Sequence, residues 1–408
     1  MMTLVHEGET MREDKKIFAK GLVVGILVLV WGYTVVSGGM ALYRRHFSED
    51  ISVYDKIAVI HSILEHHFVG DVDPQAMEDA MFAGLLYGVG DRYTSYMNSA
   101  EFARFMELSR GTYVGIGAVV TRGEDGSVII VSPHRNSPAY LGGLLPGDRI
   151  REVDGIDIRE KSDLSLIIGM IQGPEGTQVN LTIYREMESR SFNVDLTRAV
   201  VEIPTIDYEL KDGNLGFIRM SGFDAVTYQQ FVDAFESLES QGMEGLILDL
   251  RNNPGGRLDT VVRITDRLVP EGLIVYTEDA HGNRRELHSE GGHIEMPFVI
   301  LMNGNSASAS EVLAGAAQDH GVATIVGEQS FGKGLVQDIF PLPDGSAIRV
   351  TVATYYTPLG RSIHDIGLTP DVVVEMDEAL SANLARIERE EDVQLQRAIE
   401  VILAKIGE

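Results

Sequence analysis

The spacing of apolar residues changes character several times along the chain. Within residues 50–110, Ile57, Ile60 and Leu64 follow the three- and four-residue spacing of a helix. From residue 112 to residue 198 the pattern becomes short apolar strands separated by glycine turns. We therefore predict an N-terminal helical region over residues 50–110 and a β-rich domain over residues 112–198.

Residues 199–376 alternate apolar strands with helices. Continuous apolar runs such as residues 245–248 and 297–302 indicate strands that are covered by helices on both faces. We predict an α/β core for this segment. The segment 377–408 has apolar residues on one helical face and is predicted to form an acidic amphipathic helix. The chain as a whole is thus predicted to be a multidomain α+β protein.

Residues 21–43 contain no charged side chain and are long enough for a helix that crosses a bilayer, for which about 20 residues suffice. Four positive charges precede this stretch and two follow it, which favours a cytoplasmic location for residues 1–20. A cleaved signal peptide is the alternative, because residues 37–39 (Ser-Gly-Gly) are small, but the apolar run exceeds the roughly 7–15 residues of a signal peptide. We expect a single-pass anchor in the inner (cell) membrane, with the bulk of the chain on the periplasmic or extracytoplasmic side. Cleavage of the segment would give a secreted form.

The composition excludes several classes of function. Acidic residues outnumber basic ones by 61 to 34, and the net charge of −27 repels phosphate backbones, so we expect no nucleic-acid partner. The chain has no cysteine, which excludes disulfides, thiol nucleophiles and cysteine-ligated zinc. His61, His66 and His67 lack the HExxH spacing of a zinc helix, so we expect no metal site.

Two loops of the core segment hold residues suited to chemistry. The first, residues 327–334 (GEQSFGKG), nearly matches the phosphate-binding pattern GxxxxGK[ST]. Gly334 stands where a hydroxyl would hold Mg²⁺, and a strand rather than a helix follows, so nucleotide binding is not expected. Lys333 is left in a tight glycine loop, where burial would lower the pKa of its amine from the usual value of about 10.4.

The second loop is residues 306–311 (SASASE). Ser308 and Glu311 have the spacing of a helix capping box, which is the structural interpretation. The functional interpretation makes Ser308 a nucleophile at a helix N-terminus, where free backbone N–H groups stabilise an oxyanion. A nucleophilic serine needs a base. His320 lies at the end of the same predicted helix, and the remaining candidate is Lys333 in its neutral form.

The β-rich segment contains a further candidate site. Its glycine-rich loop consists of Gly115, Ile116, Gly117 and Ala118. With Ser-Pro-Ala at 137–139 and Gly-Asp-Arg-Ile at 147–150, this loop resembles that of a PDZ domain of the bacterial, circularly permuted kind. The resemblance implies that the loop N–H groups bind a peptide's terminal carboxylate, while the next strand adds the peptide to the sheet. We expect no side chain to compete for these N–H groups, and substrates with free, apolar C-termini.

Several runs in the core complete a wider resemblance, to the C-terminal processing (tail-specific) peptidases, over residues 50–376. The runs are SASASEV (306–312), VGEQSFGKGLVQ (326–337), DLRNNPGG (249–256), TPLGRSI (357–363) and GLTPDV (367–372). That family consists of serine–lysine proteases with an inserted PDZ domain and a core that resembles the crotonase and Clp-protease type of ββα sheet. The resemblance implies protein substrates and no cofactor.

The resemblance also implies roles for individual residues. Ser308 is the nucleophile, and Lys333, 25 residues on, is the general base. Gln337, four residues further along the same face of a strand, would hold the lysine amine by a hydrogen bond. The implied oxyanion donors are the N–H groups of Ala309 and Gly256, with Gly255 as the alternative to Gly256.

Two positions depart from the family pattern. Many members have Asp-Pro-His-Ser where this chain has residues 91–94 (Asp-Arg-Tyr-Thr), and a basic residue where it has Gln172. The second departure puts in doubt how substrate binding at the PDZ domain is signalled to Ser308 and Lys333. Two other functional classes stay open: a catalytically silent PDZ scaffold, and an acyl-transfer enzyme on a crotonase-like core.

The expected partners follow from the same features. They are protein substrates, the membrane through the N-terminal helix and an adaptor or regulatory protein. A homo-oligomer is expected because the apolar faces of residues 57–64 and 395–406 must pack against another surface, and a second subunit would provide one. The alternative cover for these faces is the chain's own core.

Overall fold

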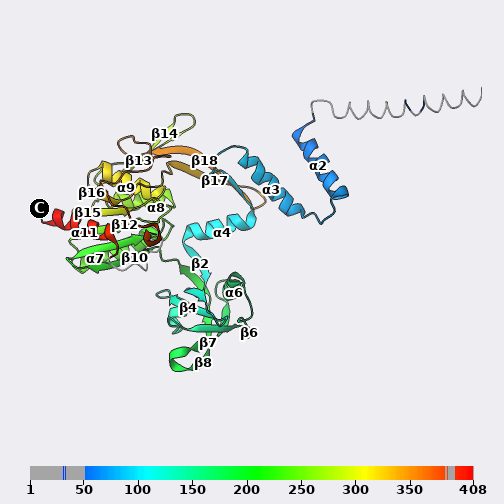
Figure 1. The fold of residues 1–408 in the computed structure, drawn as a ribbon, viewed down its shortest axis with the longest axis horizontal. Coiled ribbons are helices and arrows are strands. Elements are labelled where there is room, and N and C mark those ends of the chain that lie inside the picture. Colours follow the sequence, from blue (N-terminus) through cyan, green and yellow to red (C-terminus); the bar gives the residue numbers. More distant parts are fainter. Residues whose placement is uncertain (1–30, 32, 34–50, 382–383, 385–390, 408) are drawn as a thin grey trace, which may run out of the picture. The chain divides into compact units, whose positions relative to one another are not determined.

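The computed structural model describes residues 31, 33, 51–381, 384 and 391–407 (Figure 1). The chain divides into two units, residues 1–80 and 81–408, and each is described by itself. The predicted membrane segment, residues 21–43, lies outside the described residues apart from Trp31 and Tyr33. Within the described part of the chain, no helix has both the length and the apolar character that crossing a membrane requires.

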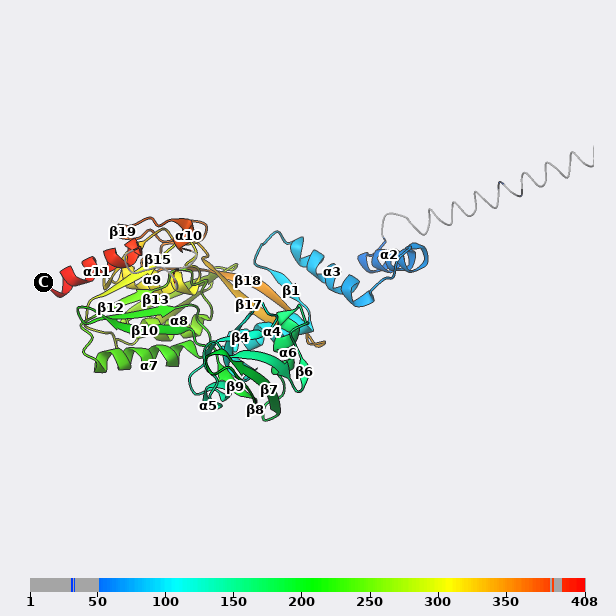
Figure 2. The same ribbon diagram turned by 60° about the horizontal axis from the view of Figure 1, so that its bottom comes forward.

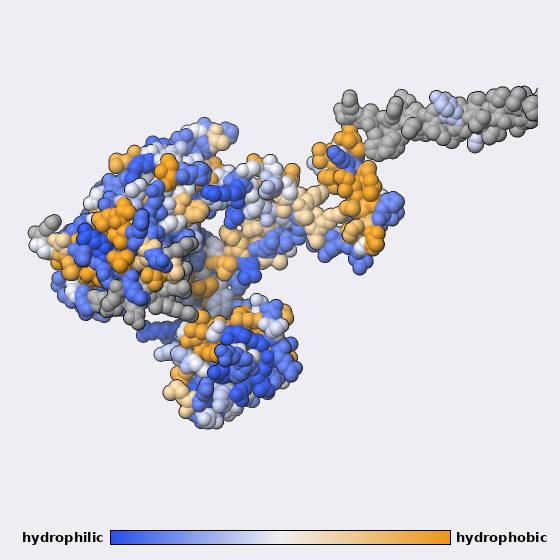
Figure 3. Space-filling view, viewed as in Figure 1, coloured by the Kyte–Doolittle hydropathy of each residue, from blue (hydrophilic) through white to orange (hydrophobic). Residues whose placement is uncertain are grey.

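The first unit contains helix α2 (Val53–His67). Its N-cap, Ser52, accepts a hydrogen bond from the N–H of Asp55 at 3.1 Å, as expected for a serine at this position. None of the helix residues is buried, and Ile60 and Ile63 are 49% and 53% exposed. Figure 3 shows hydrophobic side chains gathered over α2. The helical spacing of the sequence is therefore matched by a helix whose apolar face is exposed.

Three further elements complete the N-terminal helical region. Helix α3 (Pro74–Tyr87) runs across the boundary between the two units, and strand β1 (Ser95–Met97) and helix α4 (Ser99–Arg110) follow. Asn98 caps α4 in a complete capping box with Glu101. Gly111 ends this helix in the left-handed conformation, with φ of 69°.

The β-rich segment forms an antiparallel sheet in the order β3-β4-β5-β7-β8, with β6 paired to β5. The strands are β3 (Ala118–Arg122), β4 (Val128–Pro133), β5 (Arg149–Val153), β6 (Ile156–Asp157), β7 (Gln178–Arg185) and β8 (Arg190–Thr197). Helices α5 (Pro138–Leu141) and α6 (Leu164–Ile171) accompany the sheet. Its core contains Ile130, Ile150 and Leu181, all fully buried. Strand β3 lies at the edge of the sheet, so its outer backbone groups are open to a further strand.

A two-stranded ribbon leads into and out of this domain. Strand β2 (Thr112–Gly115) precedes it, β9 (Ala199–Glu202) follows it, and the two pair antiparallel along their whole length. The glycine-rich loop begins where β2 ends.

The core segment is built on a six-stranded sheet in the order β10-β11-β12-β15-β16-β19. All neighbours run parallel except β10 and β11. The strands are β10 (Ile206–Lys211), β11 (Leu215–Met220), β12 (Gly245–Asp249), β15 (Phe298–Met302), β16 (Ala323–Gly327) and β19 (Val372–Val373). The covering helices are α7 (Thr227–Ser240), α8 (Leu258–Asp266), α9 (Ala309–Asp319) and α11 (Val393–Ile406).

Successive residues of the central strands belong to two hydrophobic cores. In β12, Leu246 and Leu248 pack with residues of α7, α8 and α9, whereas Ile247 packs with residues of α11. Figure 2 shows α7 and α11 on opposite sides of the sheet. The two-residue alternation of a pleated strand therefore buries both faces, which explains the continuous apolar runs in the sequence.

Helix α11 uses its apolar face within its own chain. Leu395, Ala398 and Ile402 are buried against the sheet, and the short helix α10 (Glu378–Ser381) lies before them in the sequence. The cover for residues 395–406 is thus the chain's own core, and this face gives no reason to expect a second subunit.

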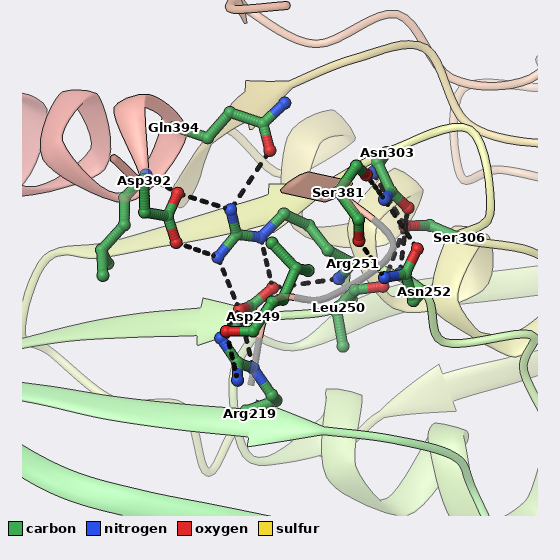
Figure 4. A network of polar contacts seen from close by, with 12 residues as sticks. Arg219, Asp249, Leu250, Arg251, Asn252, Asn303, Ser306, Ser381, Asp392 and Gln394 are labelled. Atoms are coloured by element: carbon green, nitrogen blue, oxygen red, sulfur yellow. Dashed lines mark hydrogen bonds and ion pairs between the residues drawn. The ribbon is translucent and has the colours of Figure 1, made fainter. Parts of the chain in front are cut away.

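A buried ion-pair network fastens α11 to the end of β12 (Figure 4). Arg251 donates to Asp249 from Nε and Nη2, at 2.9 and 2.8 Å, and to Asp392 from Nη1 and Nη2, at 2.7 and 2.9 Å. Asp392 is also the N-cap of α11. Burial by itself raises the pKa of Asp249, but the charges of Arg251 and Arg219 outweigh it and hold that pKa below its usual value. The network anchors the start of the loop of residues 251–256.

A second, antiparallel sheet has the order β1-β18-β13-β14, with β17 beside β18. Its further strands are β13 (Gly272–Asp279), β14 (Arg284–Ser289), β17 (Leu335–Pro341) and β18 (Ala347–Tyr356). The pairing of Ser95 with Arg349 brings the segment before β1 next to the loop that contains Lys333.

Candidate active site

Ser308 lies at the N-terminus of α9, after β15 and a short turn. Its backbone has φ of 56° and ψ of −112°, outside the regions that a residue with a Cβ normally occupies. Neighbouring bonds fix this conformation, because the carbonyl of Asn253 accepts from the N–H of Ala307 at 3.0 Å and from the hydroxyl of Ser310 at 2.9 Å. A strained backbone that its surroundings hold in place is frequent at reactive residues.

Backbone N–H groups next to Ser308 are free to stabilise an oxyanion. Within the described residues, the N–H groups of Ala309 and Gly256 donate no hydrogen bond. The N–H of Gly255, in contrast, donates to Oδ1 of Asn253 at 2.9 Å. This geometry favours Gly256 over Gly255 as the second donor.

Gly255 instead allows a close approach of two loops. A Cβ at this position would lie 2.9 Å from both the Cβ of Ser308 and the N of Ala309, closer than real Cβ atoms come. The backbone of Gly255 also has φ of 100°, which residues with a side chain rarely adopt.

Glu311 is fully buried and connects the serine to the lysine loop. Its Oε2 accepts from the N–H of Ser308 at 2.7 Å and from the N–H of Lys333 at 2.9 Å. Its Oε1 accepts from the N–H of Gly332 at 2.7 Å and from the hydroxyl of Ser330 at 2.5 Å. The bond from the Ser308 N–H to Glu311 is the half of the predicted capping box that the Glu311 side chain makes. The same carboxylate also accepts hydrogen bonds from N–H groups of residues 327–334, the loop that nearly matches a phosphate-binding pattern.

Tyr355, in β18, makes a second link between the same two residues. Its buried hydroxyl lies 2.9 Å from the carbonyl oxygen of Ser308 and 2.5 Å from that of Lys333. Burial is the main cause that raises the pKa of Tyr355 well above its usual value, so it stays a proton donor. The backbones of Ser308 and Lys333 are thus tied through their N–H groups by Glu311 and through their carbonyls by Tyr355.

The Lys333 side chain is half-buried and faces an aromatic ring. Its Nζ lies 4.8 Å from the centroid of Tyr93 and makes no hydrogen bond or ion pair within the described residues. Burial is the largest cause that lowers the pKa of this amine, and the charges of Arg349 and Arg92 lower it further. The environment thus favours the neutral amine that a general base requires.

The structure does not form two of the expected side-chain contacts around Lys333. Within the described residues, no hydrogen bond joins its amine to the hydroxyl of Ser308 or to Gln337, whose Nε2 is buried without a partner. A β-bulge between Val336 and Gln337 interrupts the two-residue alternation on which the expected position of Gln337 rested.

His320 is not a base for Ser308. It follows the last residue of α9, so about 16 Å of helix separates it from the serine. Its Nε2 bonds to the carbonyl of Leu273 at 2.8 Å, which is a structural role.

The glycine-rich loop of residues 115–118 lies between β2 and the edge strand β3. The hydroxyl of Tyr113 lies close to the N–H groups of Ala118 and Gly117, so a side chain of the protein is near donors for which no competitor was expected. These contacts lower the pKa of Tyr113, but burial, the larger effect, raises it overall. A Cβ on Gly115 would lie 2.9 Å from the Tyr113 ring, so this ring covers the loop. The loop sequence alone does not indicate Tyr113, because this residue lies in β2 before the loop.

Comparisons with known proteins agree with this architecture. The model of peptidase family S41 matches residues 214–374, and a PDZ-domain model matches residues 129–185. The chain is 36% identical over 334 residues to a carboxy-terminal-processing protease of Bartonella bacilliformis, which covers 79% of this chain and 76% of that protein. It is also 36% identical over 329 residues to a carboxyl-terminal-processing protease of Synechocystis, with the same coverage of each chain.

Among solved structures, a photosystem II D1 C-terminal processing protease is 32% identical and covers 78% of this chain and 86% of its own, with a TM-score of 0.46. The identity and coverage of the sequence relatives show that the chain belongs to peptidase family S41, as a serine-type peptidase with a PDZ domain.

Proposed function

We propose that the chain is a processing endopeptidase that recognises the free, apolar C-termini of envelope proteins and cleaves these proteins by a Ser308–Lys333 mechanism. The observation that carries this proposal is the pair of free N–H groups, on Ala309 and Gly256, beside a serine in a strained helix N-terminus. The names of the relatives, which are carboxy-terminal processing proteases, support the choice of substrate.

The proposed reaction begins with the neutral amine of Lys333. The amine takes the proton of the Ser308 hydroxyl while the oxygen attacks a peptide carbonyl carbon, and the negative charge that develops rests on the N–H groups of Ala309 and Gly256. The lysine ammonium then gives its proton to the leaving amine, which breaks the peptide bond and leaves an acyl-enzyme. A water molecule, deprotonated by Lys333, hydrolyses the ester and restores Ser308.

The contacts around Lys333 imply a movement before the first step. The amine lies against Tyr93 and must turn to the serine hydroxyl, while Glu311 and Tyr355 keep the two backbones in place. Catalytic hydrogen bonds are often long without substrate and shorten when it binds. Gln337 has a buried amide free to bond the amine once it turns.

The PDZ domain would present the substrate. A peptide that adds to the edge of β3 would have its terminal carboxylate at the N–H groups of residues 115–118, where it would compete with the nearby hydroxyl of Tyr113. A carboxylate is the stronger acceptor, because charge-assisted hydrogen bonds are about twice as strong as neutral ones.

The proposed location is the extracytoplasmic side of the membrane, with residues 21–43 as anchor or cleaved signal. The uncharged run and the flanking positive charges support it. Self-association is proposed through the exposed apolar face of α2, and an adaptor or regulatory protein remains a candidate partner.

The decisive experiment uses an unstructured protein that ends in apolar residues, incubated with the chain lacking residues 1–43. We expect time-dependent cleavage that stops in the Ser308→Ala variant and slows when the substrate C-terminus is amidated. Cleavage that ignores amidation would contradict recognition through the carboxylate. No cleavage by any preparation, combined with hydrolysis of an acyl-CoA thioester, would contradict the protease assignment.

A further inference from the structure

The segment of residues 91–94 is built firmly into one wall of the active site. The carboxylate of Asp91 accepts from the hydroxyls of Thr94 and Thr351, both at 2.6 Å, and from the N–H of Tyr93 at 3.1 Å. The N–H of Thr351 in turn donates to the hydroxyl oxygen of Thr94 at 3.2 Å. Because these bonds fasten the segment to β18, Tyr93 has a fixed position beside the lysine loop.

The ring of Tyr93 faces two cations. The Nζ of Lys333 lies 4.8 Å from its centroid, and the Cζ of Arg92 lies 4.7 Å from it, so less than 10 Å separates the two charges. A third cation is close, because Arg349 donates from Nε to the backbone carbonyl of Tyr93 at 3.2 Å. The segment therefore concentrates positive charge around an amine that has no ion pair of its own within the described residues.

We propose that Arg92, with Arg349, is a positioning residue for proteolysis that places positive charge beside Lys333 and so favours the neutral, proton-accepting form of its amine. Tyr93 is the spacer that sets the distance between these charges. This inference rests on the proposed function, because it takes Lys333 as the general base.

The charges around Lys333 do not all change the pKa of its amine in the same direction. They come from four elements that pack around the lysine loop. The segment 91–94, α9 and β18 contribute Asp91, Arg92, Tyr93, Glu311, Arg349 and Tyr355. The segment 363–367, which packs against Gly332 and Gly334, contributes His364 and Asp365. Burial of the amine comes first among the causes that lower its pKa, then Arg349, then Arg92, while Asp91 and Glu311 act against them. The face of the Tyr93 ring attracts cations and also favours the ammonium. The two guanidinium groups therefore offset groups that would otherwise keep the lysine charged.

Arg92 is the charge that this chain adds to the common pattern. It stands where many members of the family have proline, a neutral residue. Its side chain is 61% exposed and pairs at 3.5 Å with Asp365, itself 70% exposed, so its effect depends on salt. One substitution at this exposed position can therefore remove the charge.

The test is the dependence of kcat/KM on pH for the Arg92→Gln variant. Activity requires the neutral amine and therefore rises with pH through the pKa of Lys333. Loss of a nearby positive charge raises that pKa, so the rising limb moves to higher pH. We expect a move of about 0.5 unit at low salt, which is about a threefold loss of activity on the limb, and a smaller move in about 0.5 M salt.

Two matched variants separate charge from structure. Arg92→Lys keeps the charge and should keep the wild-type profile, whereas Arg104→Gln removes the same charge from the exposed surface of α4 and should leave the profile in place. A profile that Arg92→Gln leaves unmoved, or lowers equally at every pH, overturns the proposal. The proposed function is tested apart from it, because full activity in Lys333→Ala would remove the general base whatever Arg92 does.

Discussion

Two regions of this molecule are proposed to offer backbone N–H groups to an anionic oxygen, and they differ in whether a side chain of the protein lies close to those groups. Beside Ser308, the N–H groups of Ala309 and Gly256 donate no hydrogen bond within the described residues. In the PDZ loop, the N–H groups of Gly117 and Ala118 have the hydroxyl of Tyr113 close by. The proposed catalytic donors are therefore free before the charge develops, whereas a carboxylate at the proposed binding donors would compete with a neighbouring hydroxyl.

The difference fits the two tasks. An oxyanion is present only at the transition state, so free, fixed donors stabilise it without prior rearrangement. A substrate carboxylate is already charged in the ground state, and a weak internal acceptor lowers its affinity without preventing binding.

The largest expected effect comes from removing the reacting groups. Ser308→Ala and Lys333→Ala should each abolish proteolysis, because the hydroxyl and the amine act as one unit. The double variant should be no worse than either single one. Activity toward an unstructured protein and the far-ultraviolet circular dichroism of each variant check this. Residual cleavage in Lys333→Ala above about one part in a thousand would indicate another base.

The next effect compares one glycine of each region. Gly255→Ala puts a Cβ 2.9 Å from the Cβ of Ser308, which displaces the serine from its donors. We expect kcat to fall by about 10²–10³-fold, the cost of losing an oxyanion donor. Gly117→Ala puts a Cβ 2.3 Å from the Cβ of Ser137 and should raise KM for protein substrates with little change in kcat. If both variants changed only KM, the two regions would not have the separate tasks proposed here.

A smaller effect is expected from the two links between Ser308 and Lys333. Glu311→Gln replaces a carboxylate oxygen by an amide that faces N–H donors, and we expect kcat to fall by about 30–100-fold. Tyr355→Phe removes one hydroxyl and should lower kcat by about fivefold, near the value of a single hydrogen bond. The neighbouring Tyr356→Phe is the matched control and should retain wild-type kcat. Thermal unfolding distinguishes misplacement from loss of the fold, because Tyr355→Phe should shift Tm by only a few degrees.

The smallest expected effect tests directly whether the hydroxyl of Tyr113 competes for the N–H groups of the PDZ loop. Tyr113→Phe removes the competing hydroxyl and keeps the ring, so a peptide with a free C-terminus should bind about 3–10-fold more tightly. Calorimetric titration of the Ser308→Ala protein, with and without this second change, measures the gain. The amidated peptide is the control and should show none. Equal affinities for the free acid in both proteins would mean that Tyr113 does not occupy the site.

The parts predicted correctly from the sequence are those that short-range patterns encode. The apolar runs of β12 and β15 mark strands buried on both faces, and the core sheet has them at its centre. The spacing of Ser308 and Glu311 predicts a helix start, and α9 begins there. The two interpretations of this spacing turn out to be compatible, because the carboxylate of the capping box is also what ties the serine to the lysine loop.

The rest depends on contacts between residues far apart in the sequence. Tyr93 reaches the site because β1 pairs with β18, and Tyr355 because β18 pairs with β13 and contacts Gly334. No spacing in the sequence signals such pairings. The bulge beside Gln337 in β17 has no signal in the sequence, because no glycine or proline marks it, and the role of Gln337 stays a prediction. The sequence does not show which surface packs against the apolar face of α11. Such a face packs equally well against the chain's own core and against a second subunit, and only the position of the sheet decides between them.

The buried contact of Arg251 with Asp392 has a consequence for the order in which the protein becomes an enzyme. Arg251 begins the loop that carries Gly256, but its second carboxylate partner is synthesised 141 residues later. When Ser308 and Lys333 have been synthesised, α11 has not. The guanidinium of Arg251 then lacks its bonds to Asp392, and the face of the sheet that contains Ile247 is not covered by α11. We therefore expect the loop that carries Gly256 to reach its final position only once α11 has docked.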